Sequence, residues 1–204
     1  MKKNKQIRKV ISHIEKISGG IEKNNQIPCI SKRDFEKNII DIENFIGAKI
    51  SLLLIDIWSE LNGIMFNNEI GIEADDKIPT LEKRQFIEFT RFFAIEDKGD
   101  YVLEILKSNN DIFEKKYIPF AEALDGDFFA INNQNNAIYY IMHDFNDDEK
   151  YAYIVSKNVE SFFMSLQIIP PLSDTNSDEN EPKIISSNLS NSLFSKLQDF
   201  KKNK

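Results

Sequence analysis

Apolar residues recur at helical spacing along the first third of the chain. Residues 1–18 carry isoleucine or valine at positions three or four apart, and a glycine pair ends the pattern. A second amphipathic segment begins at Ser31, whose hydroxyl can accept a hydrogen bond from the backbone near Asp34, and it stops at Gly47. The pattern predicts two helices, and we expect the apolar stripe of the first to dock on the rest of the domain.

Two more helices are predicted further along the chain. One runs from about Ser51 to Asn62 and is apolar on nearly all sides, which predicts deep burial; Asn62-Gly63 should close it in the left-handed conformation. The other follows Ser156, which can act as its cap, and the proline pair at 170–171 forbids its continuation.

Between these helices the pattern changes to short runs rich in aromatic and β-branched residues, which are typical of strands. The runs cover residues 86–95, 101–106, 127–131, 137–142 and 151–155. Turn-forming residues stand between them at 97–100, at Asp125-Gly126, at 132–136 and at 146–149. The short spacing predicts antiparallel hairpins, so the predicted fold class is α+β.

Three parts of the chain are expected. Residues 1–20 form a helical N-terminal extension, and residues 28–170 form a single α+β domain. Residues 171–204 begin with a tract rich in Ser, Asp, Asn and Glu, which predicts a flexible linker, and end in a short apolar stripe typical of a C-terminal helix.

Composition narrows the range of partners. The chain has 204 residues, of which 41% are hydrophobic, so most of it should fold around a core. Its net charge is −7, which argues against nucleic acid as the main partner, because phosphate contacts require clustered Lys and Arg. A basic protein partner suits this charge; the alternative is that the charge only keeps the protein in solution.

The single cysteine, Cys29, cannot form an internal disulfide, and with His13 and His143 it cannot supply the four ligands of a structural zinc site. Charged residues interrupt the basic N-terminus, unlike a signal peptide, and no apolar run is long enough to span a membrane. We therefore predict a cytosolic protein in a reducing compartment, with no membrane contact and no cofactor.

The sequence predicts no catalytic or metal-binding residues. It contains no phosphate-binding loop, no dinucleotide fingerprint and none of the common hydrolase motifs. His143 and Asp144 are the only adjoining base and carboxylate, but neighbours on a strand point to opposite faces. Asp144 also opens a D-x-N-x-D string of the calcium-loop type, yet Glu149 and Val155 stand where that loop needs glycine and glutamate.

The densest acidic cluster of the predicted domain comprises Asp144, Asp147, Asp148 and Glu149. Exposed charges of this kind can steer a basic partner and set its orientation, so these four residues are the candidate partner-binding residues. The alternative is a solvated turn with no such role.

Three strings in this order carry a resemblance to a known family. They are WSELNG at 58–63, YIPFAEALDGDFFAIN at 117–132 and SFFMSL at 161–166. Together they resemble the SUKH superfamily, which includes the yeast cell-wall-synthesis regulator domain and many bacterial immunity proteins, over about residues 28–168. The sequence departs from the family pattern in lacking a proline between the two early helices and in reducing a glycine-rich element to Gly63.

The resemblance implies a curved, mostly antiparallel sheet with helices packed on it, and a protein-binding function without catalysis. Bacterial members are generally thought to neutralise toxins, many of them nucleases, so it implies an immunity protein whose partner is a basic toxin domain. Two alternatives stay open. One is a regulatory scaffold in a signalling or cell-envelope pathway that recruits partners through its termini, and the other is a small hydrolase built on His143.

Overall fold

The computed structural model describes residues 5–22, 30–73, 78, 81, 86–96, 101–145 and 150–170. As far as Ile169 these residues belong to one compact unit. Its helices are α1 (Lys5–Ile17), α2 (Lys32–Ile46), α3 (Leu52–Leu61), α4 (Val102–Ser108), α5 (Asn110–Phe113) and α6 (Val159–Ser165). Its strands are β1 (Ile21–Glu22), β2 (Met65–Phe66), β3 (Ile70–Glu73), β4 (Phe86–Phe92), β5 (Tyr117–Ala123), β6 (Phe128–Asn132), β7 (Ile138–Ile141), β8 (Ala152–Ser156) and β9 (Gln167–Ile168).

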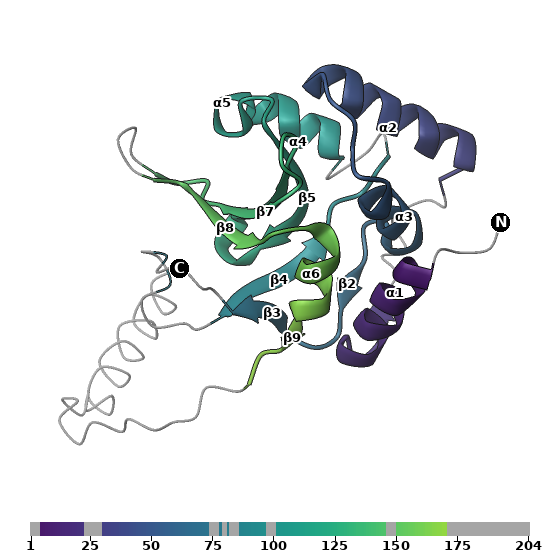
Figure 1. The fold of residues 1–204 in the computed structure, drawn as a ribbon, viewed down its shortest axis with the longest axis vertical. Coiled ribbons are helices and arrows are strands. Elements are labelled where there is room, and N and C mark those ends of the chain that lie inside the picture. Colours follow the sequence, from purple (N-terminus) through teal and green to yellow (C-terminus); the bar gives the residue numbers. More distant parts are fainter. Residues whose placement is uncertain are drawn as a thin grey trace, which may run out of the picture. The chain divides into compact units, whose positions relative to one another are not determined.

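The strands form a curled sheet with helices packed against it, as Figure 1 shows. Its order is β1-β2-β4-β5-β6-β7-β8, and β3 pairs with both β4 and β9. Every pairing between these strands is antiparallel. The register shifts within the β4–β5, β5–β6 and β7–β8 pairs, and such bulges bend strands and increase their twist. The predicted α+β class and the curved antiparallel sheet are confirmed.

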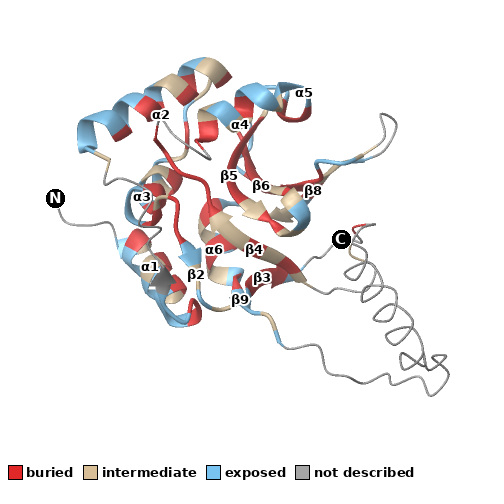
Figure 2. Ribbon diagram, turned by 180° about the vertical axis from the view of Figure 1, so that it is seen from behind, coloured by how far each residue is buried: buried red, intermediate tan, exposed pale blue. Residues whose placement is uncertain are grey.

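Aromatic rings fill the core between α6 and one face of the sheet. Phe162 of α6 lies 5.1 Å from Phe129 of β6, and Phe163 stacks on Phe92 of β4 at 5.7 Å, both measured between ring centroids. On the opposite face, Phe113 of α5 meets Phe128 edge-on at 5.1 Å. Neighbouring strand residues point to opposite faces, so Phe128 and Phe129 anchor helices on the two sides of the sheet. The buried residues line these helix–sheet contacts (Figure 2).

Helix α1 docks as expected. Its apolar stripe is buried, and the helix contacts α3 and α6. The amide of Asn68 donates to the carbonyl of Ile17 at 2.9 Å, and the Asn68 backbone N–H donates to Ser18 at the same distance, so the loop before β3 satisfies the C-terminal carbonyls of α1. His13 donates from Nε2 to the Leu166 carbonyl at 2.9 Å, which ties α1 to the end of α6.

The caps of α2 follow the sequence closely. The Ser31 hydroxyl accepts from the Asp34 backbone N–H at 3.1 Å, and Gly47 ends the helix with a φ of 78°. At the end of α3 the left-handed residue is Gly63, with a φ of 62°, while Asn62 stays extended and its side-chain oxygen accepts from the Ile95 N–H. The prediction that α3 is buried on nearly all sides was wrong at Leu52, which is 79% exposed.

Other predictions were also wrong. Residues 101–106 belong mostly to helix α4, because Val102 and Leu106, four apart, are fully buried on one helical face. The cap of α6 is Asn158, whose side chain accepts from the Ser161 N–H at 2.8 Å. Strand β5 was not predicted. Proline is disfavoured in a central strand, and a bulge between Pro119 and Ala121 accommodates it here.

Candidate functional site

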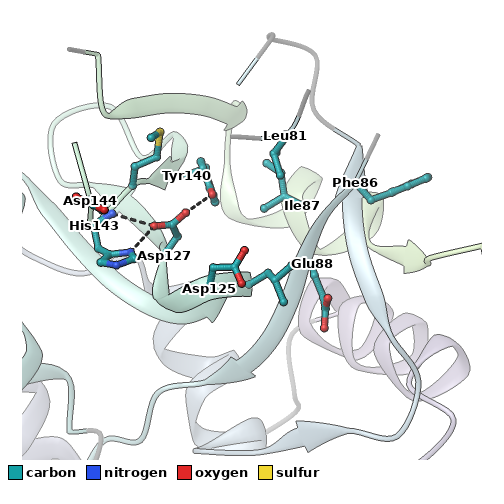
Figure 3. A pocket seen from close by; sticks show the side chains of 11 residues that line it. Leu81, Phe86, Ile87, Glu88, Asp125, Asp127, Tyr140, His143 and Asp144 are labelled. Atoms are coloured by element: carbon teal, nitrogen blue, oxygen red, sulfur yellow. Dashed lines mark hydrogen bonds and ion pairs between the residues drawn. The ribbon is translucent and has the colours of Figure 1, made fainter. Parts of the chain in front are cut away.

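A buried carboxylate organises one end of the β6–β7 hairpin. Asp127 accepts hydrogen bonds from the Tyr140 hydroxyl, from the His143 backbone N–H at 2.9 Å and from His143 Nδ1 at 2.7 Å, as the dashed lines of Figure 3 show. Asp127 and Tyr140 are buried, whereas the His143 side chain is 45% exposed. We call these three residues the Asp127 cluster. Its bonds link residues that lie 13 and 16 positions apart in the chain.

Local sequence explains why these side chains meet. Between β5 and β6 the chain reverses through Asp125 and Gly126, which have φ values of 62° and 87°, and it enters β6 directly after Asp127. The hairpin register pairs Phe128 with Ile141, so the residues just before β6 lie beside those just after β7. The His143 ring also lies over Gly126, where an added Cβ would be 3.7 Å from its Cε1 atom.

A cavity of about 210 Å³ adjoins the cluster. Leu81, Phe86 and Ile87 contribute an apolar wall from the β4 side, and Asp125, Asp144 and His143 contribute polar groups from the hairpin side (Figure 3). Glu88 of β4 and the apolar Leu124 and Met142 of the hairpin side also line the cavity, so polar and apolar groups stand on both sides of it.

The chemistry available at this cavity is limited. A carboxylate on Nδ1 orients an imidazole and sets its tautomer, which is an arrangement that general bases use. Among the described residues that line the cavity there is no serine, threonine or cysteine to serve as a nucleophile. Within the described ranges no group of three or more His, Cys, Asp or Glu side chains is placed to hold a metal ion. The geometry favours a structural role, in which the hydrogen bonds of Asp127 hold the end of the hairpin together and the His143 ring stays partly exposed.

The structure describes only some of the predicted site residues. Asp144 is exposed and lines the cavity, whereas Asp147, Asp148, Glu149 and Cys29 lie outside the described residues. His143 does not act with its neighbour Asp144 but pairs with Asp127, which the sequence analysis missed together with Tyr140. The signal that would have found them is the hairpin itself: a turn at 132–136 places residue 127 next to residues 142 and 143.

A second cluster joins the end of α5 to the β7–β8 hairpin. The Tyr117 and Tyr139 rings lie 5.1 Å apart, and the Lys116 ammonium lies 4.9 Å from the Tyr117 ring centroid. Burial raises the pKa of Tyr151, and the nearby Glu114 carboxylate raises it further. The Tyr117 hydroxyl stabilises the charged Lys116 and raises its pKa. We call Tyr117, Tyr139, Tyr151 and Lys116 the tyrosine cluster.

Comparison with known families decides the classification. The model of the SMI1/KNR4 family (SUKH-1) matches residues 36–165, which is well over half of the chain. The chain belongs to the SMI1/KNR4 family. The match runs from α2 to α6, so it includes the sheet from β2 to β8 and both clusters described above.

Membership of the SMI1/KNR4 family confirms the resemblance seen in the sequence, and it fits a toxin-immunity or regulatory domain that acts by protein–protein interaction. Members of the family are generally non-enzymatic. No curated protein matches the chain. In the described part of the chain, every helix is too short or too polar to cross a membrane.

Proposed function

We propose that this SMI1/KNR4-family protein is a cytosolic bacterial immunity protein that binds and neutralises a toxin domain. The observation that carries the proposal is the family match over residues 36–165, which runs from α2 to α6. The toxin is a basic protein, and nucleases are the favoured class. The immunity protein inhibits it by binding to its surface and catalyses no reaction of its own.

Charge supports this assignment. The chain carries a net charge of −7, and electrostatic attraction raises the association rate of oppositely charged proteins and disfavours like-charged ones. Asp144 is exposed beside the cavity, and the acidic residues at 147–149 follow it in sequence. These four carboxylates are the proposed contact for a basic toxin surface.

The regulatory-scaffold alternative receives less support. In that alternative a partner binds helix α1. The apolar stripe of α1 is already buried against α3 and α6, so only the basic outer face of the helix remains for a partner. The hydrolase alternative needs a nucleophile or an activated water at His143, and the SMI1/KNR4 family is generally non-enzymatic.

The test is a co-expression pull-down of the full-length tagged protein with the product of the adjacent upstream gene, at low and at high salt. We expect capture of a basic, toxin-like protein that weakens as salt screens the attraction. Asp144→Lys should weaken capture, whereas Asp111→Lys, an equal charge change at an exposed position of α5, should not. Failure of the wild-type protein to capture that product would refute the proposal.

A further inference from the structure

The cavity beside the Asp127 cluster combines acidic side chains with apolar ones. Four carboxylic residues, Glu88, Asp125, Asp127 and Asp144, belong to its lining, and no lysine or arginine stands among the described residues around it. Pockets that bind drug-sized molecules usually measure about 300 to 1,000 Å³, whereas this cavity measures about 210 Å³. The cavity therefore has room for one side chain of a partner, and its charge suits a cation.

Two of these carboxylates lie in the middle of the cavity. Figure 3 shows the Asp125 and Asp127 side chains between the His143 ring and the apolar pair Leu81 and Ile87. Asp127 is buried and accepts three hydrogen bonds, whereas a carboxylate offers about four acceptor positions, so one position on its Oδ2 atom remains. Asp125 is exposed, and its side chain bonds to no other described residue. Both carboxylates can therefore accept from a donor that enters the cavity.

An arginine side chain matches this lining. Its aliphatic stem can lie along Leu81 and Ile87, while its planar guanidinium presents several donors that can reach two carboxylates at once. A lysine ammonium is a more strongly hydrated point charge, so it loses more hydration on entering beside apolar side chains. Arginine is also one of the residues that most often anchor an interface from a buried pocket.

We propose that the basic toxin partner inserts one arginine side chain into this cavity, between the Asp125 and Asp127 carboxylates. The apolar side chains of Leu81 and Ile87 cover the stem of that arginine, and the exposed Asp144 at the same cavity adds to the attraction. This inference rests on the proposed function and names the anchor through which the toxin is held.

The first test needs no toxin. The methionine methyl resonances of the full-length protein are followed by NMR while methylguanidinium is added. Met142 lines the cavity, and Met65, which is 42% exposed on β2, serves as the internal reference. We expect a saturable shift at Met142 alone, a weaker response to methylammonium, and loss of the shift in Asp125→Asn. Asparagine tolerates the left-handed φ of 62° at this position, so the variant removes the charge without straining the turn.

The same titration separates the toxin from this chain as the source of the arginine. Lys83 and Arg84 stand in the sequence between the lining residues Leu81 and Phe86. A Met142 shift that appears only in Arg84→Gln would show that the cavity takes an arginine of this chain, and it would overturn the assignment to the partner. No shift in either protein, or an equal response to methylammonium, overturns the arginine site itself.

The second test measures the rates of binding to the adjacent gene's product, supplied in inactive form. Loss of one member of a buried charge pair acts mainly on dissociation, whereas loss of an exposed charge acts on association. Asp125→Asn should raise the dissociation rate about tenfold, and Asp111→Asn, an equal change of charge at an exposed position of α5, should leave that rate unchanged.

An unchanged dissociation rate for Asp125→Asn overturns the assignment of the cavity and leaves the immunity function standing. Absence of binding by the wild-type protein removes the proposed function, and with it the toxin as the occupant, whatever the response to methylguanidinium.

Discussion

Removal of the Asp127 carboxylate is the sharpest test of the structural role of the Asp127 cluster. Asp127→Ala deletes the acceptor of three hydrogen bonds, one of them from the buried Tyr140 side chain. Hydrogen bonds to charged groups contribute about 1.5 to 3 kcal/mol each, and their contributions are not additive. The bond to the His143 ring contributes less than the others, because that side chain is 45% exposed. We expect the free energy of unfolding to fall by about 3 to 5 kcal/mol.

The cluster also predicts coupling between its members. Tyr140→Phe alone removes one bond to the carboxylate and should cost about 1 to 2 kcal/mol. In the Asp127→Ala background the same change cannot remove this bond a second time, because the acceptor is already absent. The double variant should therefore lose less stability than the two single variants together, with a coupling energy of about 1 to 2 kcal/mol.

Urea denaturation of the full-length variants measures these values. Trp58 is the single tryptophan and is fully buried, so its fluorescence reports loss of the core. Asp111→Ala, at an exposed position of α5, serves as the control and should change stability by no more than about 0.5 kcal/mol. A cost below about 1 kcal/mol for Asp127→Ala, or simple additivity with Tyr140→Phe, would refute the role assigned to the cluster.

Three further predictions concern the core, the tyrosine cluster and α1. Phe129→Ala should cost about 3 to 5 kcal/mol by urea denaturation, whereas Leu52→Ala, at a 79% exposed position, should be nearly neutral; similar costs would contradict the assigned core. Folding raises the pKa of Tyr151 above its ordinary value of 10, so the neutral tyrosine favours the folded state. This contribution to the free energy of unfolding is fully present below about pH 10 and is lost as the pH rises through the raised pKa. Tyr151→Phe should therefore flatten the alkaline loss of stability in a urea series from about pH 8 to 11, and an unchanged slope would count against this. Asn68→Ala should speed hydrogen exchange in α1 by about tenfold, corresponding to about 1.4 kcal/mol, with α2 unchanged as the internal reference.

Neighbouring residues alone accounted for several features of the fold. Helix α2 lies between a serine cap and a left-handed glycine because those interactions span only a few residues. Alternation and short turns predicted the antiparallel β6, β7 and β8, since a hairpin register depends on the turn that joins the strands. The family was recognisable for the same reason: each of its strings is a short local structure in a fixed order.

The candidate site was less predictable. Asp144 and His143 were noticed because they adjoin in sequence, but His143 pairs with Asp127, which stands just before β6. That partnership depends on register and burial across the hairpin, which the residues beside His143 do not encode. The sequence analysis considered a base and a carboxylate only as neighbours, so it passed over the cross-strand pair.

By itself, the sequence determined the class of the fold, most of its helices and hairpins, and the SMI1/KNR4 relationship, because these depend on local caps, turns and periodicity. Only the tertiary structure decided that residues 102–108 are helical, that Pro119 enters a central strand, and that Asp127 is buried under Tyr140 and His143. It also decided that β8 stands last in the order of the described strands. The physical reason is the same in each case: a residue's partner across the sheet, and the solvent it loses there, are set by segments distant in the chain.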